Sequence, residues 1–398
     1  MAGDAVGFKG ELEFPTRSRE KFARMKEAPH EVLFIKTMKF SPWIRPFFQV
    51  LLWVASAGGG IAIAETVVVK NPAELRAALS RLESGTVLKI APGDYPGGNH
   101  VKGIENLVIE ALNTEEPPHF RGGGNAWQFS RCPGLTVRNL RVSGQTNNGF
   151  NLDDGGLLDQ PVAGITLEGL DVQDIGPQGN FDGIKCSGLT GLTIHRCTLQ
   201  GWGGQGIDFV GCHRSVISEC QFVGKDGFSA SAGIQLKGGT SEVVVEKCHF
   251  KNAGQRPLNI GGSTGLAFFR PQGALHEAKS IIVRHNVIEG SPCAAAFVGV
   301  DGAEFTDNTI LFPEKWIFRI LQETREARFA ACRNVSIKNN KIRFKRSQVA
   351  TDINIGGGTA PETFRFEGNL WLATDSPHQS KPKLPVEEQS GIYGRDFF

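Results

Sequence analysis

The 398-residue chain has only two tyrosines, three methionines and eight cysteines, and its charges nearly cancel. Forty-three basic and forty-one acidic residues leave a formal net charge of +2, which excludes a protein whose main task is to grip nucleic acid through its phosphates. Eight cysteines over this length are too few for a disulfide scaffold, and no C-x-x-C pair indicates a structural zinc site. Any charged ligand must therefore be bound by a local patch of side chains.

Glycine is abundant. Fifty glycines, with 40% hydrophobic and 21% charged residues, describe a chain that has many turns and a substantial core, so wholesale disorder is excluded. Length alone does not decide between two or three average domains and one elongated domain built from repeats. The absence of a helical period over most of the chain favours β-structure.

The N-terminal 64 residues differ from the rest and indicate an export signal behind a leading extension. From Met38 the chain has a charged start, an apolar stretch and then Ala62-Ile63-Ala64, a small-x-small cleavage site. We expect residues 38–64 to be a signal peptide and residues 1–37 to be a non-native or disordered extension. An uncleaved membrane anchor is the alternative, but the apolar stretch is barely long enough to span a bilayer and contains three consecutive glycines. The mature protein is then expected to be secreted or periplasmic, with no stable membrane insertion.

The mature chain starts with signals for a short strand and one helix. The strand is expected at Thr66–Val69. Asn71 then offers an N-cap, Pro72 suits the first helical position, and apolar residues follow at helical spacing. We expect this helix to span residues 72–83 and to cover one open end of the domain that follows.

A phrase of alternating apolar residues, a small or amide residue and glycine recurs nine times between Gly134 and Ala373. One aligned column of these copies contains Asn139, Gly169, Cys197, Cys220, Cys248, Asn286, Asn308, Asn340 and Asn369. Neighbouring members lie 22 to 38 residues apart. The shorter intervals match one turn of a parallel β-helix, and the longer ones are turns that carry loops.

The repeat predicts an all-β solenoid, a single-stranded parallel β-helix over residues 65–376 with the short helix as its N-terminal cap. Each strand pairs in parallel with the copies above and below it at about 4.8 Å, so like residues stack into ladders. Buried asparagines are expected to hydrogen-bond along the stack, and the central cysteines to be packed thiols rather than disulfides. Residues 377–398 are expected to be an extended tail packed on the coil.

A second phrase gives each turn another strand, as in GFNLDD (149–154), GIDFVG (206–211) and GIQLKGG (233–239). Because successive side chains of a strand point to opposite faces, the apolar residues face the core and the alternate residues face outward. The outward set comprises Asn151, Asp153, Lys185, Asp208, Gln235, Lys237 and Asn259, with Asp182, Arg256 and His213 at its margins. Such a stripe of carboxylates, amines and amides suits a chain-shaped ligand.

The region from about residue 85 to 375 resembles the right-handed parallel β-helix of the pectin lyase-like superfamily, whose members mostly cut or remodel acidic polysaccharides at an exterior groove. The nearest local similarity is to the lyases related to chondroitinase B and alginate lyase. In these a lysine precedes Gly-x-x-x-Leu-Arg-x-Gly by about one turn. Here Lys237 precedes GQRPLNIG (254–261), so the resemblance implies that Lys237 is the base, whereas Asn259 occupies the place of the arginine and Arg256 stands three residues earlier.

The resemblance implies cleavage of a uronate-containing polysaccharide by β-elimination. This reaction removes a proton next to a carboxylate, neutralises that carboxylate and helps the leaving oxygen to depart. The catalytic candidates are Lys237 as base, with Arg256 and Lys185 to lower its pKa and attract the polyanion. The substrate-binding candidates are Asn151, Asp182, Asp208, His213, Gln235 and Asn259. The candidate cofactor is Ca²⁺ held by Asp153, Asp182 or Asp208.

Two other functions stay open. The segment Asn180-Phe181-Asp182-Gly183 is similar to the start of the polygalacturonase motif, which implies a glycoside hydrolase that uses Asp182 and Asp208. Gly204-Gln205 stand where that motif has paired aspartates. A non-catalytic carbohydrate-binding β-helix would instead carry the stripe as solvated ion pairs, such as Lys185 with Asp208. The expected partner is a polysaccharide, and the protein is expected to be a monomer.

Overall fold

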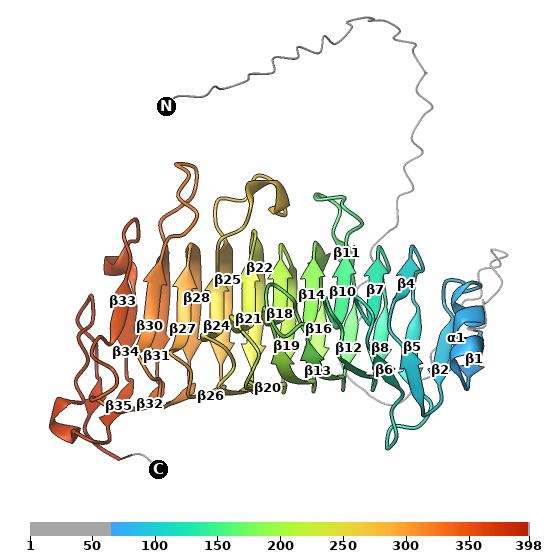
Figure 1. The fold of residues 1–398 in the computed structure, drawn as a ribbon. Helices are drawn as coiled ribbons and strands as arrows, with labels where there is room; N and C mark the ends of the chain where they lie inside the picture. The colour runs from blue at the N-terminus through green and yellow to red at the C-terminus, as the bar shows by residue number, and fades with distance from the viewer. Residues whose placement is uncertain (1–64, 397–398) are drawn as a thin grey trace, which may run out of the picture. The chain divides into compact units, whose positions relative to one another are not determined.

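The computed structural model describes residues 65–396, which form a solenoid of parallel β-strands (Figure 1). The predicted signal peptide at 38–64 and the extension at 1–37 lie outside the described residues. Within residues 65–396, no helix is long and apolar enough to cross a membrane.

The strands form three parallel sheets, here named sheets A, B and C, and nearly every turn of the coil adds one strand to each. Sheet A contains β1 (Thr66–Val69), β2 (Val87–Ile90), β5 (Val108–Ala111), β8 (Thr136–Arg138), β12 (Thr166–Glu168), β16 (Thr193–His195), β19 (His213–Ser218), β22 (Thr240–Glu246), β25 (Ala278–Arg284), β28 (Val300–Thr306), β31 (Arg333–Lys338) and β34 (Arg365–Glu367), with β11 (Val162–Ala163) and β15 (Leu189–Thr190) beside them.

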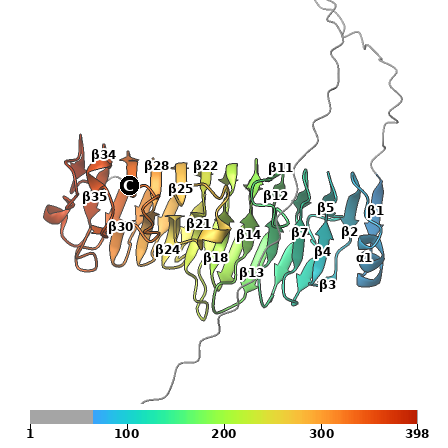
Figure 2. The same ribbon diagram turned by 90° about the horizontal axis from the view of Figure 1, so that it is seen from above.

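Sheet B contains β3 (Asp94–Pro96), β6 (His119–Arg121), β9 (Arg141–Ser143), β13 (Asp171–Ile175), β17 (Thr198–Trp202), β20 (Gln221–Val223), β23 (His249–Lys251), β26 (Val287–Glu289), β29 (Thr309–Leu311), β32 (Lys341–Phe344), β35 (Leu370–Ala373) and β36 (Ile392–Tyr393). Sheet C contains β4 (Asn99–Lys102), β7 (Trp127–Ser130), β10 (Phe150–Asp153), β14 (Ile184–Ser187), β18 (Gln205–Val210), β21 (Ala232–Lys237), β24 (Arg256–Gly261), β27 (Cys293–Val298), β30 (Trp316–Leu321) and β33 (Ile353–Ile355). Seen from above, the strands follow one another along the length of the solenoid (Figure 2).

Parallel pairing in register builds the core. In sheet A, Leu167 pairs with Ile194 and Ile194 with Ile217, and all three side chains are fully buried. Each is an inward residue of its strand, so the ladder repeats one apolar position at every turn. The predicted β-helix fold is therefore confirmed.

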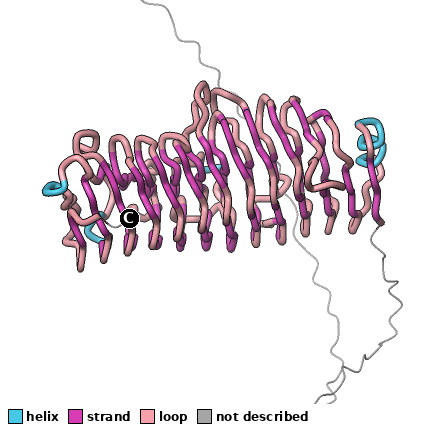
Figure 3. The backbone as a smooth tube through the Cα atoms, turned by 90° about the horizontal axis from the view of Figure 1, so that it is seen from below, coloured by secondary structure: helices cyan, strands magenta, loops and turns pink. Residues whose placement is uncertain are grey.

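The predicted capping helix is α1, Pro72–Leu79, at the N-terminal end of the solenoid (Figure 3). The Asn71 side chain accepts hydrogen bonds from the backbone N–H groups of Ala73 and Glu74, which satisfies two donors of the first turn. The helix ends four residues earlier than the predicted residue 83, because the chain must turn through Gly85, whose φ is +85°, to begin β2. Three short 3₁₀ helices, Leu266–Phe268 (η1), Pro361–Thr363 (η2) and Pro377–Gln379 (η3), complete the helical content of the described residues.

The predicted asparagine ladder runs through the C-terminal half of the core. The side-chain Nδ2 groups of Asn286, Asn308 and Asn340 each donate to Oδ1 of the next asparagine along the ladder, at 2.9, 3.1 and 2.9 Å. Asn369 ends the series and donates to the Glu388 carboxylate at 2.7 Å. All four asparagines are at most 1% exposed, so the stack satisfies polar groups that water does not reach.

Cysteines occupy the same core column in the middle of the solenoid. Cys197, Cys220 and Cys248 are buried, and all eight cysteines of the chain are buried free thiols. The prediction of packed thiols instead of disulfides is confirmed. A thiol is small and only weakly polar, so it fills the position without needing the hydrogen bonds that an amide requires.

The first two members of the predicted column were placed wrongly by one residue. Leu140 and Leu170, not Asn139 and Gly169, are the buried residues in register with Cys197. Asn139 and Gly169 lie at the corner before the inward residue, where their φ angles are +53° and +61°. Asparagine and glycine tolerate this left-handed backbone, so the same residue types serve at the corner and in the core.

The C-terminal tail lies against the last turns. Its strand β36 pairs in parallel with β35 at the end of sheet B. The Glu388 carboxylate accepts hydrogen bonds from Asn369, from the Trp371 indole at 2.9 Å and from the Tyr393 hydroxyl at 2.9 Å. The tail thus supplies acceptors at the end of the solenoid where the next turn would have stood.

Replacing Asn308 by alanine is expected to lower the free energy of unfolding by about 2–3 kcal/mol, because the buried N–H groups of Asn286 lose their acceptor. Urea unfolding followed by circular dichroism measures the change. Asn113→Ala, at an exposed turn, is the control and should cost less than about 1 kcal/mol. Equal effects of the two substitutions would contradict a structural role for the ladder.

Candidate active-site cleft

The outward polar residues of sheet C stand in one register column. Asn151 pairs with Lys185, Lys185 with Asp208, Asp208 with Gln235 and Gln235 with Asn259. The inward neighbours in the same strands, such as Ile184 and Ile207, are fully buried in the core. Residues that lie far apart in the sequence are thereby brought within one or two strand spacings of one another.

A cleft of about 850 Å³ opens beside this column. Lys185, Asp208 and Lys237 line it from sheet C, together with residues of the preceding turns: His100, Lys102, Asn151 and Asp153. Its other wall comes from the loop after β24, which contributes Ser263, Thr264, Gly265, Phe268 and Arg270. Asp154, Gly155 and Gly156, from the loop after β10, line it as well. The site is therefore a hollow between the outer surface of sheet C and two loops.

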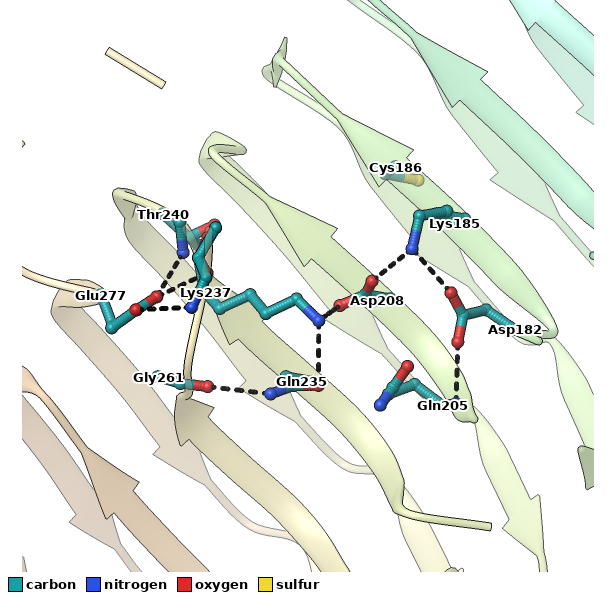
Figure 4. Close-up of polar contacts among 12 residues, drawn as sticks. Asp182, Lys185, Cys186, Gln205, Asp208, Gln235, Lys237, Thr240, Gly261 and Glu277 are labelled. Carbon is teal, nitrogen blue, oxygen red and sulfur yellow. Dashed lines mark hydrogen bonds and ion pairs between the residues drawn. The ribbon is translucent and has the colours of Figure 1, made fainter. Parts of the chain in front are cut away.

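An alternating chain of charges runs across the sheet (Figure 4). Lys185 Nζ lies 2.9 Å from Asp182 Oδ2 and 2.7 Å from Asp208 Oδ2, and Lys237 Nζ lies 3.1 Å from the other oxygen of Asp208. Both aspartate side chains have no exposed surface, whereas those of Lys185 and Lys237 are 26% and 14% exposed. The carboxylates thus lie beneath the ammonium groups. The binding-protein hypothesis expected solvated ion pairs instead, and these carboxylates are not solvated.

The charge of Lys185 is balanced locally. Burial alone would lower its pKa, but the carboxylates of Asp208 and Asp182 outweigh burial, and the pKa of Lys185 is raised. Lys185 therefore stays an ammonium group. Its charge is shared with two carboxylates, so it is not the uncompensated cation that was expected to lower the pKa of Lys237.

Asp182 is enclosed and does not line the cleft. Its Oδ1 accepts the backbone N–H of Gln205 at 2.9 Å, and its Oδ2 accepts Lys185. Burial raises the pKa of Asp182, the Asp208 carboxylate adds to that effect, and Lys185 opposes it. Asp182 is thus placed to hold Lys185 rather than to touch a ligand.

Lys237 is held at the end of β21. Besides Asp208, its Nζ lies 3.3 Å from Oε1 of Gln235, whose amide donates in turn to the carbonyl of Gly261 at 3.4 Å. The turn that follows is fixed where the N–H of Gly238 donates to the buried Glu277 carboxylate at 2.8 Å. Gln235 therefore positions Lys237 and, although predicted to bind substrate, does not line the cleft.

Buried carboxylates that sequence reasoning missed secure the wall loop. Arg270 donates to Asp154 through Nε at 2.6 Å and Nη2 at 3.2 Å, and Asp154 has no exposed surface. Glu277 accepts the backbone N–H and the hydroxyl of Thr264 at 2.9 and 2.7 Å. The available signal was the interval from Cys248 to Asn286, the longest in the repeat, which indicates an insertion but not its contacts.

Three further predicted site residues, besides Asp182 and Gln235, lie outside the cleft. Arg256 begins β24, in register with Ala232, and so sits five residues along the strand from the level of Lys237, about 16 Å away. There it contacts Glu323 at 3.5 Å and Asn259, which does not line the cleft either. His213 lies on β19 of sheet A, past the corner, where its Nδ1 pairs with the Ser241 hydroxyl at 2.9 Å.

The proposed calcium ligands do not fit a calcium site. Asp182 and Asp208 are bound by lysines, and Asp153 accepts hydrogen bonds from Gln128 at 2.6 Å and from the N–H of Gly155 at 2.8 Å. In residues 65–396, no group of three or more His, Cys, Asp or Glu side chains is arranged to hold a metal ion. Calcium prefers six or more oxygen ligands, which this set does not offer.

Replacing Asp182 by asparagine is expected to change how stability depends on pH. Because the pKa of Asp182 is raised above its ordinary 3.8, the folded protein binds this proton more tightly than the unfolded chain. The free energy of unfolding of the wild type should therefore fall, relative to Asp182→Asn, as pH rises from about 4 to 7. Urea unfolding across this range tests it, and a constant difference between the two proteins would contradict it.

Comparison with known proteins identifies the fold. Residues 124–310 match the family described as the right handed beta helix region. No curated protein has a sequence that matches this chain.

Several solved structures are similar over most of the chain. An endo-xylogalacturonan hydrolase from Aspergillus tubingensis is 14% identical, with a TM-score of 0.53 over 82% of this chain and 100% of its own. An alginate lyase from Paenibacillus sp. str. FPU-7 is 18% identical, with a TM-score of 0.50 over 74% of this chain and 99% of its own. The A-module of a mannuronan C-5 epimerase from Azotobacter vinelandii is 12% identical, with a TM-score of 0.50 over 81% and 93%. The chain thus has the right-handed parallel β-helix fold.

Proposed function

We propose that this protein is a secreted enzyme that cleaves an acidic, uronate-containing polysaccharide by β-elimination in the cleft beside sheet C. The observation that carries the proposal is the pair of ammonium groups, Lys185 and Lys237, that face the cleft from either side of the buried Asp208 carboxylate. The similar solved structures, which are an alginate lyase, an endo-xylogalacturonan hydrolase and a mannuronan C-5 epimerase, favour a carbohydrate substrate.

The charges of the cleft suit a polyanion. Lys185 and Lys237 project toward the cleft above carboxylates that water does not reach, and Lys102 also lines it, whereas Arg270 is paired with the buried Asp154. A uronate carboxylate placed over the two lysines would receive charge-assisted hydrogen bonds in a partly enclosed site, where they are stronger than in water. This neutralisation stabilises the carbanion-like charge that develops when the neighbouring proton leaves.

Lys237 is the proton-transfer residue of the proposed reaction. Its amine accepts the proton from the carbon next to the carboxylate after its own ammonium proton has passed to Asp208, 3.1 Å away. The electron pair of the broken C–H bond forms a carbon–carbon double bond, and the bond to the glycosidic oxygen breaks. The leaving oxygen takes up a proton from the Lys237 ammonium or from water.

The hydrolase alternative uses the same aspartates differently. It needs one protonated carboxylic acid at the leaving oxygen and another carboxylate at a water molecule. The raised pKa of Asp182 would suit an acid, but its side chain is fully enclosed and both of its oxygens have protein partners. This enclosure favours elimination over hydrolysis.

Incubating the mature protein with alginate, pectate and glycosaminoglycans separates the candidate functions. A lyase produces the ultraviolet absorbance of unsaturated uronates, a hydrolase produces reducing ends without it, and a binding protein produces neither. We expect rising absorbance with at least one of these substrates. Reducing ends without absorbance would overturn the lyase proposal in favour of the hydrolase.

Replacing Lys237 by alanine should lower kcat by about 100-fold or more, because the group that moves the proton is removed. The matched control is Lys225→Ala, since Lys225 also pairs with an aspartate, Asp174, but is 43% exposed and does not line the cleft. The control should keep wild-type kcat. Unchanged activity of Lys237→Ala would remove this residue from the mechanism.

A further inference from the structure

The wall loop of the cleft carries an aromatic side chain that faces water. Phe268, in the short helix η1, is 62% exposed, the largest value among the exposed large hydrophobic residues of the described chain. It lines the same cleft as Lys185 and Lys237. Ligand-binding pockets typically combine aromatic side chains with a few well-placed polar groups, and this cleft has both.

The neighbouring phenylalanine anchors the loop. Phe269 is fully buried, and its ring lies 5.1 Å from that of Phe329. Gln272 donates to the carbonyl of Phe269 at 2.9 Å and to that of Ala267 at 3.0 Å. Phe269 therefore anchors the loop by packing in the interior, whereas the adjacent Phe268 is exposed to the cleft.

Buried ion pairing holds Phe268 in place. Nη1 of Arg270 donates to the carbonyl of Phe268 at 2.9 Å, while the rest of the guanidinium group grips the buried Asp154. Moving the loop away would leave the buried Asp154 carboxylate without its partner, which is strongly unfavourable. At the base of the loop, a Cβ atom on Gly262 would lie 3.4 Å from Cβ of Lys237, so the wall starts directly beside the lysine.

We propose that Phe268 is a stacking platform for a pyranose ring of the substrate, and that the residues opposite it select an acidic sugar. The C–H groups on one face of a pyranose form an apolar patch with positively polarised hydrogens, which suits the negative face of an aromatic ring. The ring carboxylate then points toward Lys185 and Lys237. The inference rests on the proposed function and adds to it the subsite that orients the sugar.

The two sides of the cleft together restrict the ligand class. A lipid would cover the partly exposed ammonium groups of Lys185 and Lys237 with apolar surface, and a simple inorganic anion would leave the exposed ring of Phe268 without a contact. A uronate sugar satisfies both sides because it carries a carboxylate and an apolar face on one rigid ring. The ligand class is therefore an acidic hexopyranose within a chain.

Steady-state kinetics can test the platform. The variants Phe268→Ala and Phe268→Trp are compared with the wild type on the uronate polysaccharide that the wild type cleaves. Phe268→Ala should raise KM about 10-fold with little change in kcat, equivalent to about 1.4 kcal/mol of lost binding. Phe268→Trp should retain most of the wild-type affinity, because a larger aromatic face is kept. Phe312→Ala, at an aromatic residue that is 36% exposed and outside the cleft, is the control and should leave KM unchanged.

Affinity electrophoresis in gels that contain alginate, pectate or a glycosaminoglycan gives a second readout that does not need turnover. Retardation of the wild type and of Phe312→Ala, but not of Phe268→Ala, supports the platform even if no cleavage is found and the lyase proposal fails. Equal retardation of Phe268→Ala and the wild type, or equal KM values, overturns the platform while leaving the lyase proposal standing. No retardation of the wild type in any gel overturns the platform as well.

Discussion

The parallel pairing of each strand with its copy one turn away is the interaction on which the rest of this structure depends. It sets the backbone spacing at about 4.8 Å and keeps equivalent residues in register, so one position of the repeat becomes a line through the protein. Inside the coil such lines are Leu167, Ile194 and Ile217, or the asparagine ladder. Outside the coil, the same pairing aligns Lys185, Asp208 and Gln235. The same repeat therefore aligns both the core residues and the residues that line the cleft.

Stacking also brings charges close together, and each must find a partner. Along the outward column, Asp208 lies between two lysines, and Asp182 takes the remaining side of Lys185. Because the aspartates are buried beneath the ammonium groups, the pairing is only weakly screened by water and salt. The same principle secures the loop opposite, where Arg270 and Asp154 form a buried pair. Ion pairs with buried carboxylates therefore fix the side chains on both walls of the cleft. Such fixed positions allow a reacting group to be placed precisely.

The accuracy of sequence reasoning followed the strength of the local pattern. Strand β1, the N-cap Asn71 and the asparagine ladder carry periodic or capping signals, and all were predicted. The column failed by one residue at Asn139 and Gly169, because the left-handed corner favours the same residue types as the interior. Arg256 was placed near Lys237 from the spacing of a motif, yet strand direction puts the two at opposite ends of adjacent strands. The number of residues between two positions shows whether they lie side by side in adjacent strands only when the start and end of each strand are known.

By itself, the sequence determined the fold class, the inward and outward faces of each strand, and the alignment of Lys185, Asp208 and Lys237 on one outer surface. These follow from alternation and repeat length, which are local properties of the chain. Only the tertiary structure decided which outward residues are buried and that Asp182 is enclosed. It also decided that Asp154, Arg270 and Phe268 line the cleft and that Glu277 secures its wall loop. Their contacts join segments separated by as many as 116 residues through an inserted loop. The path of such a loop depends on long-range ion pairs and packing, which have no period to recognise in the sequence.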